Sequence, residues 1–395
     1  MNDKALLKSC IPHPNRNVEL GGISYLFMSA NTKFSSVAKI SDKADRPILL
    51  IVQQAPGSRL AREFGANVLS HPLVVETAED LFVPVALIRG SNGNHAASVA
   101  DGNGYADTLS KYDQPASITP LIRIMNSEGV DLVPPIADKG CTIGNITSAM
   151  TQALESHNRV MEYPYPRYLK HLMVSERAQE IQAVSKIFLG ASCFWVGEAE
   201  LGAAHGVIAT QIAWLGGREI VIVSFDKKIT SYQELVRFAI AKEVVEIIYY
   251  CSDAEKDVAE RQVELKIAKC KVARLTGSVG GSVQLEHDTK NFIARTGFRY
   301  IPLTRYQSSR INSALFHHKE GEGIALLSPR QSAIFRNICS NPEKEREEVI
   351  DTPIHAAWET CMKKDGIRAC DRISIDLQNH AQLLRISELA LRNSG

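Results

Sequence analysis

Cys193 is the residue whose type and position most favour chemistry. The apolar residues 187–189 predict a strand, the small residues 190–192 predict a turn, and a helix is expected from Cys193 through Leu201. The amino terminus of a helix stabilises a negative charge, so a cysteine there can serve as a thiolate nucleophile. The alternative interpretation is a small buried residue that only begins a helix.

The elements that follow Cys193 predict how it is positioned. After its helix, two strands are expected to form a hairpin around the glycine turn 215–217. The hairpin strands, the next helix, a further strand and a charged helix are predicted at residues 206–214, 219–226, 229 onward, 246–250 and 252–269. The resulting order, β-α-β-β-α-β, is typical of a ferredoxin-like antiparallel sheet that is covered by helices on one face.

The segment around Cys193, GASCFWVGEAE, resembles the GCFWxxE signature of the peptide methionine sulfoxide reductase A family. The hairpin sequence 213–217, AWLGG, is similar to that family's GYxGG, and Glu219 falls where the family's strand carries a catalytic glutamate. Weaker similarity is found at residues 224–226, 231–235, 249–253, 258–260 and 305–308. The resemblance runs from about residue 187 to 315.

The resemblance implies reduction of methionine sulfoxide, in peptides or free, by a peptide-methionine (S)-S-oxide reductase-like oxidoreductase. Cys193 would attack the sulfoxide sulfur and be left as a sulfenic acid, while Glu219 would protonate the oxygen. No cofactor is implied, because an external thiol reductant such as thioredoxin would restore the cysteine. The substrate-binding residues implied are aromatic: Phe194, Trp195, Trp214 and Tyr306. Aromatic residues next to a strand-helix turn are most often core residues, so Phe194 and Trp195 would pack there with or without catalysis.

Two segments of the family are shortened in this chain. The long loop before the catalytic glutamate is reduced to Arg218, and the segment that carries an oxygen-binding Asp and Tyr has no counterpart between Phe238 and Ile247. Loss of such hydrogen-bond donors lowers turnover, so two alternatives stay open. One is a catalytically degenerate protein that acts as a binding module. The other is a different thiol chemistry at Cys193.

A second organised region lies before this one. The apolar segment 48–52 predicts a buried strand, and a helix and a parallel strand at 81–88 follow it. A further strand at 118–124 is expected to form a hairpin with 130–133. This region, 46–156, resembles a thioredoxin-like domain, with Ala55-Pro56-Gly57-Ser58 where the redox CxxC would lie and Thr119-Pro120 where that fold keeps a cis-proline. Without two thiols it would serve for docking, or only for stability.

The predicted class is therefore α/β and α+β, in three parts. They are a thioredoxin-like domain without redox cysteines, a reductase-like domain and a helical extension, at residues 40–160, 181–326 and 327–395. The prolines of segment 162–166 stop a helix and place a linker near there, and a helix at 175–186 is expected to lead into the second domain.

Composition excludes several other classes of protein. The 395-residue chain carries 45 Lys and Arg against 44 Asp and Glu, a net charge of +1, so nucleic acid is not an expected partner. Apolar runs such as 47–52 are too short for a bilayer, so no membrane partner is expected either. Residues 1–10 lack the apolar stretch of a secretory signal, which favours a cytoplasmic location. The oligomeric state is not indicated.

The other cysteines show no metal-binding spacing. The chain has 8 cysteines and no CxxC pair, so a structural zinc site is not expected, and His317-His318 is poorly suited to hold one ion. A thiol that could resolve an oxidised Cys193 is sought among the later cysteines. The candidates are Cys251, Cys270, Cys339, Cys361 and Cys370.

Overall fold

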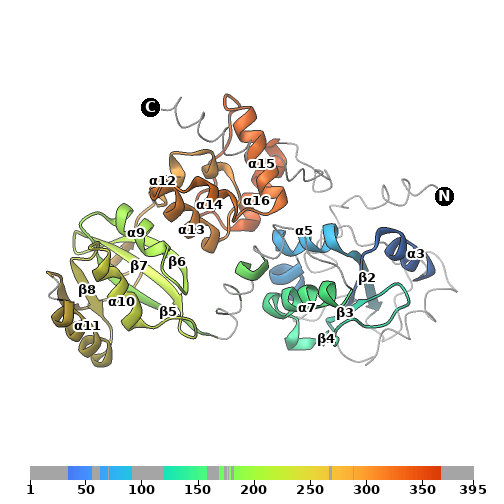
Figure 1. Ribbon diagram of the computed structural model, residues 1–395, viewed down its shortest axis with the longest axis horizontal. Coiled ribbons are helices and arrows are strands. Elements are labelled where there is room, and N and C mark those ends of the chain that lie inside the picture. The colour runs from blue at the N-terminus through green and yellow to red at the C-terminus, as the bar shows by residue number, and fades with distance from the viewer. Residues whose placement is uncertain are drawn as a thin grey trace. The chain divides into compact units, whose positions relative to one another are not determined.

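The structure is a computed structural model, and it divides into two compact units, Met1–Arg177 and Ala178–Gly395. Each unit contains its own mixed sheet with helices packed against it, so the chain is of mixed α and β class (Figure 1). The residues that the structure describes are 34–55, 63–69, 71–90, 119–157, 169–172, 176, 178, 182–266, 269–287 and 289–365. None of the described helices is long and apolar enough to cross a membrane.

The first unit contains a four-stranded sheet in the order β2-β1-β3-β4. The first two strands pair in parallel, as predicted, and the structure also shows β3 antiparallel to β1. The strands are β1 Ile48–Ala55, β2 Val83–Gly90, β3 Leu121–Met125 and β4 Ile136–Ala137. The helices are α3 Phe34–Ala44, η1 Gly65–Leu69, α5 Pro72–Leu81, η2 Asp138–Gly140 and α7 Ile143–Ser156. The peptide bond between Thr119 and Pro120 is cis.

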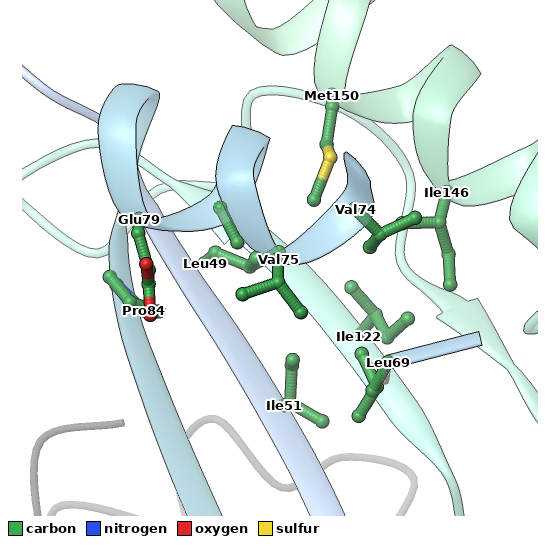
Figure 2. Close-up of a pocket in the computed structure, with 11 residues that line it drawn as sticks. Leu49, Ile51, Leu69, Val74, Val75, Glu79, Pro84, Ile122, Ile146 and Met150 are labelled. Carbon is green, nitrogen blue, oxygen red and sulfur yellow. The ribbon is translucent and has the colours of Figure 1, made fainter. Parts of the chain in front are cut away.

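Apolar packing on both faces explains the continuous apolar sequence of β1. Ile48, Leu50 and Val52 join the core cluster that includes Val37 of α3. On the opposite face, Leu49 and Ile51 line a cavity together with side chains of α5 and α7 (Figure 2). Strands that are buried on both faces have near-continuous apolar sequences rather than alternating ones.

Two predictions in this unit are corrected. Leu81 is the last residue of α5, so the second strand begins at Val83. Residues 130–133 form no regular strand, because they make only an isolated bridge between Met125 and Asp131. The reason is local: Pro134 and Pro135 follow, and a proline has no N–H for a strand ladder. The strand that pairs with β3 is β4 instead. Residues 56–58 of the expected redox turn lie outside the described residues.

The second unit contains a six-stranded sheet in the order β10-β6-β7-β5-β8-β9. Its first six elements follow the predicted order, β-α-β-β-α-β. They are β5 Val184–Gly190, α9 Phe194–Gly202, β6 Val207–Leu215, β7 Arg218–Asp226, α10 Tyr232–Ala241 and β8 Ile247–Tyr250. Next come α11 Asp253–Lys266, β9 Lys271–Arg274 and β10 Val283–Leu285. The helix predicted at 175–186 is wrong in its last part, because residues from Val184 onward pair with β7.

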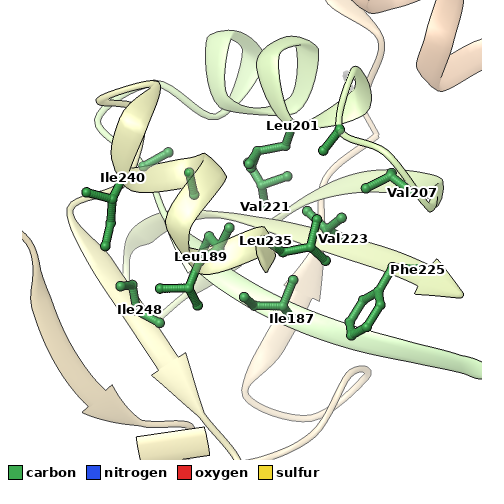
Figure 3. Close-up of a cluster of buried hydrophobic side chains, with 14 of the residues drawn as sticks. Ile187, Leu189, Leu201, Val207, Val221, Val223, Phe225, Leu235, Ile240 and Ile248 are labelled. Carbon is green, nitrogen blue, oxygen red and sulfur yellow. The ribbon is translucent and has the colours of Figure 1, made fainter. Parts of the chain in front are cut away.

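Helices α9 and α10 pack on one face of this sheet. Figure 3 shows Leu201 of α9 and Leu235 of α10 directed at Val221 and Val223 of β7. The helix α10 begins with a capping box, in which Ser231 and Glu234 each bind the other's backbone N–H. Alternate residues of the same strands, such as Ile220 and Ile222, form a second apolar cluster on the opposite face.

Short helices complete the second unit. They are α12 Asn291–Ala294, η3 Gly297–Tyr300, α13 Arg305–Phe316, α14 Glu320–Ile324, α15 Pro329–Ser340 and α16 Ile354–Asp365. They share an apolar core of their own, with Phe298 stacked on Phe335 at 4.5 Å between ring centroids. The helical part begins near residue 291, earlier than the expected extension at 327. The expected amphipathic segment 373–391 lies outside the described residues.

Candidate active site

Cys193 is the N-cap residue of α9. Its backbone is extended, at φ −144° and ψ 111°, and its half-exposed side chain makes no capping hydrogen bond. Glycine allows α9 to begin this close to the sheet, because a Cβ on Gly197 would meet Ala191 Cβ and Val221 Cγ2 at 3.2 Å. The Cys193 thiol therefore lies at the amino terminus of a helix that is packed closely on the sheet, as the sequence predicted.

Glu219 reaches the same helix terminus from β7. Its Oε2 accepts a hydrogen bond from the backbone N–H of Phe194 at 2.7 Å, and its carbonyl accepts one from Ala191 N–H at 3.0 Å. Since Phe194 is bonded to Cys193, covalent geometry limits the distance between the Cys193 Sγ and this oxygen to about 8 Å. The carboxyl group of Glu219 is therefore hydrogen-bonded to the first turn of the helix that Cys193 begins.

Three aromatic side chains cluster next to this helix terminus. The buried Phe194 ring lies 5.5 Å from Trp195 and 5.3 Å from Trp214, measured between ring centroids. Trp214 is directly opposite Glu219 in the β6–β7 hairpin, so both side chains are on one face of the sheet. Trp195 and Trp214 are only partly buried against the core. The structure thus brings Phe194, Trp195 and Trp214 together beside Cys193 and Glu219.

Tyr306 is placed elsewhere. The Arg310 guanidinium carbon lies over the Tyr306 ring, 5.3 Å from the ring centroid. Arg310 also donates hydrogen bonds to the carbonyls of Ala203 and Ala204. Those carbonyls follow the last residue of α9, about 15 Å along the helix from Cys193. The structure therefore locates Tyr306 near the end of α9 that is away from the thiol, and it does not bring it into the cluster.

The connection between α10 and β8 is short and has few oxygen-binding groups. It consists of Lys242, Glu243, Val244, Val245 and Glu246, and its two valines pack against the core that Trp195 and Trp214 also contact. No Asp or Tyr is present there. The described residues next to Cys193 therefore supply an apolar wall and one carboxyl group.

The other described cysteines are in less reactive environments. Burial raises the pKa of the Cys141 thiol to about 12, with a smaller contribution from Asp138. Burial also raises the pKa of Cys251, Cys270 and Cys339. Cys361 is buried, with its sulfur 3.3 Å from the Tyr300 carbonyl oxygen. Among the described cysteines, only Cys193 begins a helix.

A buried ion pair on α9 was not predicted from the sequence. Glu198 is fully buried and Lys290 is 1% exposed, with Nζ of Lys290 2.5 Å from Glu198 Oε1 and 2.8 Å from the Thr210 carbonyl oxygen. The Lys290 N–H also donates to Glu198 Oε2 at 2.9 Å. Glu198 belongs to the CFWxxE pattern, but nothing in the sequence around Lys290 indicates a buried lysine.

Trp214 also has a partner that sequence reasoning missed. Its indole N–H donates to Glu286 Oε2 at 2.8 Å. Glu286 follows the three-residue strand β10, which is preceded by a segment rich in glycine and serine that carries no strand pattern. Within the described parts of the chain, no group of three or more His, Cys, Asp or Glu residues could hold a metal ion.

Comparison with known proteins identifies one part of the chain. No family model matches it. Peptide methionine sulfoxide reductase MsrA of Pelagibacter ubique (strain HTCC1062) is 27% identical over 115 residues, which cover 20% of this chain and 78% of that protein. This chain contains a partial MsrA-like region. Since 20% of 395 residues is about 79, the 115-residue alignment must leave gaps on this chain's side, as shortened loops require.

Proposed function

We propose that this MsrA-like region reduces methionine sulfoxide as a peptide-methionine (S)-S-oxide reductase-like oxidoreductase. The observation that carries the proposal is the 2.7 Å hydrogen bond from the Phe194 N–H to Glu219 Oε2, which holds the Glu219 carboxyl group at the helix terminus of Cys193. The similarity to the MsrA protein over 78% of that protein's length supports the same reaction.

The proposed reaction begins with attack by the Cys193 thiolate on the sulfoxide sulfur. As the S–S contact forms, Glu219 protonates the sulfoxide oxygen. The hydroxyl is then transferred to Cys193, so the substrate leaves as the sulfide, Cys193 becomes a sulfenic acid, and Glu219 is left as a carboxylate. Substrate sulfur is reduced by two electrons, and Cys193 sulfur is oxidised by two.

External thiols complete the cycle. One thiol displaces water from the sulfenic acid to form a mixed disulfide, and a second thiol releases Cys193 and leaves as the disulfide. A thioredoxin-type protein is the proposed reductant, and peptides or free methionine sulfoxide are the proposed substrates. Phe194, Trp195 and Trp214 would receive the apolar part of the substrate.

The proposal includes a role for the first unit. Its β2-β1-β3-β4 order and its parallel β1–β2 pair support a thioredoxin-like domain. The order β6-β7-β5-β8, with every neighbouring pair antiparallel, supports a ferredoxin-like second domain. In a cytoplasmic reductase of this kind, the first domain would dock partners rather than exchange disulfides.

Turnover of a peptide that contains methionine sulfoxide, with dithiothreitol as reductant, tests the proposal. We expect the wild-type protein to consume one sulfoxide epimer, and Cys193→Ser to consume neither. Cys141→Ser is the matched control, because Cys141 belongs to the first unit and is not a candidate resolving thiol, and it should keep wild-type turnover. No turnover by the wild type would contradict the proposal and favour a catalytically degenerate binding module.

A further inference from the structure

We infer that Glu286 is a positioning residue that fixes Trp214 as the wall against which the sulfoxide methyl group binds. The inference rests on the proposed function. Its starting point is the 2.8 Å hydrogen bond from the Trp214 indole N–H to Glu286 Oε2, which joins the site to the edge strand of the sheet.

The backbone holds Glu286 in place. Strand β10 pairs with β6, with Gln284 opposite Trp214, and the Glu286 N–H donates to the Ile212 carbonyl at 3.0 Å. Residues two apart on a strand share a face, so Glu286 is on the same side of the sheet as Gln284 and Trp214. The Glu286 carboxylate can therefore hold the indole without an additional loop.

A series of contacts connects Glu286 to the reacting groups. The Trp214 ring meets Phe194 edge to face at 5.3 Å, and the Phe194 N–H is bound by Glu219 at 2.7 Å. Phe194 is also the residue next to Cys193. A change in the orientation of Trp214 would therefore alter the packing of the Phe194 ring.

An acceptor is needed because one side of Trp214 packs on an apolar core. An indole N–H without an acceptor has an energetic cost when it is removed from water, and the ring would turn to regain a partner. The hydrogen bond to Glu286 selects one orientation before the substrate arrives, which reduces the cost of ordering the site on binding.

The indole face offers apolar contact and no proton. We therefore expect Glu286 to affect how well the sulfoxide binds, while proton transfer remains with Glu219. Glu286→Ala should raise KM for N-acetyl-methionine sulfoxide by about 10-fold with kcat changed less than about 2-fold, as expected for loss of a hydrogen bond to a charged acceptor. Glu286→Gln keeps an acceptor oxygen and should restore KM to near the wild-type value.

The matched control is Glu264→Ala, which removes an exposed glutamate on α11 and should leave KM unchanged. The alkylation rate of Cys193 by iodoacetamide should be the same in all these variants, since the thiol itself is not altered. An unchanged KM in Glu286→Ala would overturn the inference, as would equal losses in Glu286→Ala and Glu286→Gln.

Absence of turnover in the wild type would refute the proposed function without deciding the role of Glu286. The role of Glu286 is then decided by a binding measurement, in which N-acetyl-methionine sulfoxide is titrated into the Cys193→Ser protein and tryptophan fluorescence is recorded. Binding that weakens with Glu286→Ala and recovers with Glu286→Gln supports the inference. No binding, or binding that is insensitive to Glu286, overturns it.

Discussion

Cys193 and Glu219 share one helix amino terminus, so negative charges on the two groups interact. The terminus stabilises a single negative charge well, but two anions this close repel each other. The proposed reaction needs only one of the two groups as an anion, because Cys193 attacks as the thiolate while Glu219 supplies the proton. In the proposed reaction, Glu219 protonates the sulfoxide oxygen as Cys193 attacks, and it is left as a carboxylate.

Replacing Glu219 by glutamine separates these two effects. Glu219→Gln removes the proton donor, so kcat for sulfoxide reduction should fall by about 10²- to 10³-fold. It also removes the neighbouring negative charge, so alkylation of Cys193 by iodoacetamide at pH 7 should be at least as fast as in the wild type. Both rates are measured on the same preparation. Wild-type turnover in Glu219→Gln would remove Glu219 from the mechanism.

The environments of the thiols predict which of them react in the folded protein. Because burial raises the pKa of Cys141 to about 12, its thiolate is scarce at pH 8, and Cys361 is buried as well. We expect mass spectrometry after brief treatment with iodoacetamide at pH 8 to find Cys193 modified well before Cys141 or Cys361. Equal labelling in urea would show that the folded structure causes the difference. Early labelling of Cys141 in the native protein would contradict its buried position.

At the scale of elements, the sequence predicted those strands and helices that are marked by apolar patterns and turn glycines. The strands β5, β6, β7 and β8 and the helix that begins after Cys193 were expected, because continuous apolar segments and the Gly216-Gly217 turn mark them. Strand β10 and the contacts of Lys290 were not predicted, because both depend on tertiary contacts that the local sequence pattern does not show. Val283 is a buried residue in a polar segment, and the buried Lys290 is paired with Glu198, with Asp351 3.9 Å from its Nζ.

The Glu198–Lys290 pair joins α9 and β6 to the start of the helical part of the second unit. Removal of one partner leaves an uncompensated buried charge, which costs about 3–5 kcal/mol. We expect Lys290→Met to lower the free energy of unfolding by about this amount in urea, and Glu198→Gln with Lys290→Met together to lower it less than the sum of the two single changes.

The control for that experiment is an exposed ion pair in the same unit. Lys256 and Glu260 on α11 are 3.8 Å apart and largely exposed, so Lys256→Met should change stability by less than about 1 kcal/mol. A loss in Lys290→Met no larger than in Lys256→Met would show that the buried pair does not stabilise the packing of α9.

At the scale of the whole molecule, the two units have separate cores, and the tryptophans report on only one of them. Trp195, Trp214 and Trp358 all belong to the second unit. Tryptophan fluorescence therefore follows unfolding of the reductase-like part, while circular dichroism follows both units. Two matched isoleucines on central strands make the comparison possible: Ile122 of β3 and Ile222 of β7, each 1% exposed.

Truncating either isoleucine should destabilise only its own unit. Each change to alanine removes buried apolar contacts and costs about 2–5 kcal/mol. Ile222→Ala should lower the urea midpoint seen by tryptophan fluorescence. Ile122→Ala should leave that midpoint in place and shift only part of the circular dichroism transition, with Cys193-dependent turnover retained. Equal fluorescence shifts in both variants would mean that the units unfold together, and the first unit would then stabilise the second.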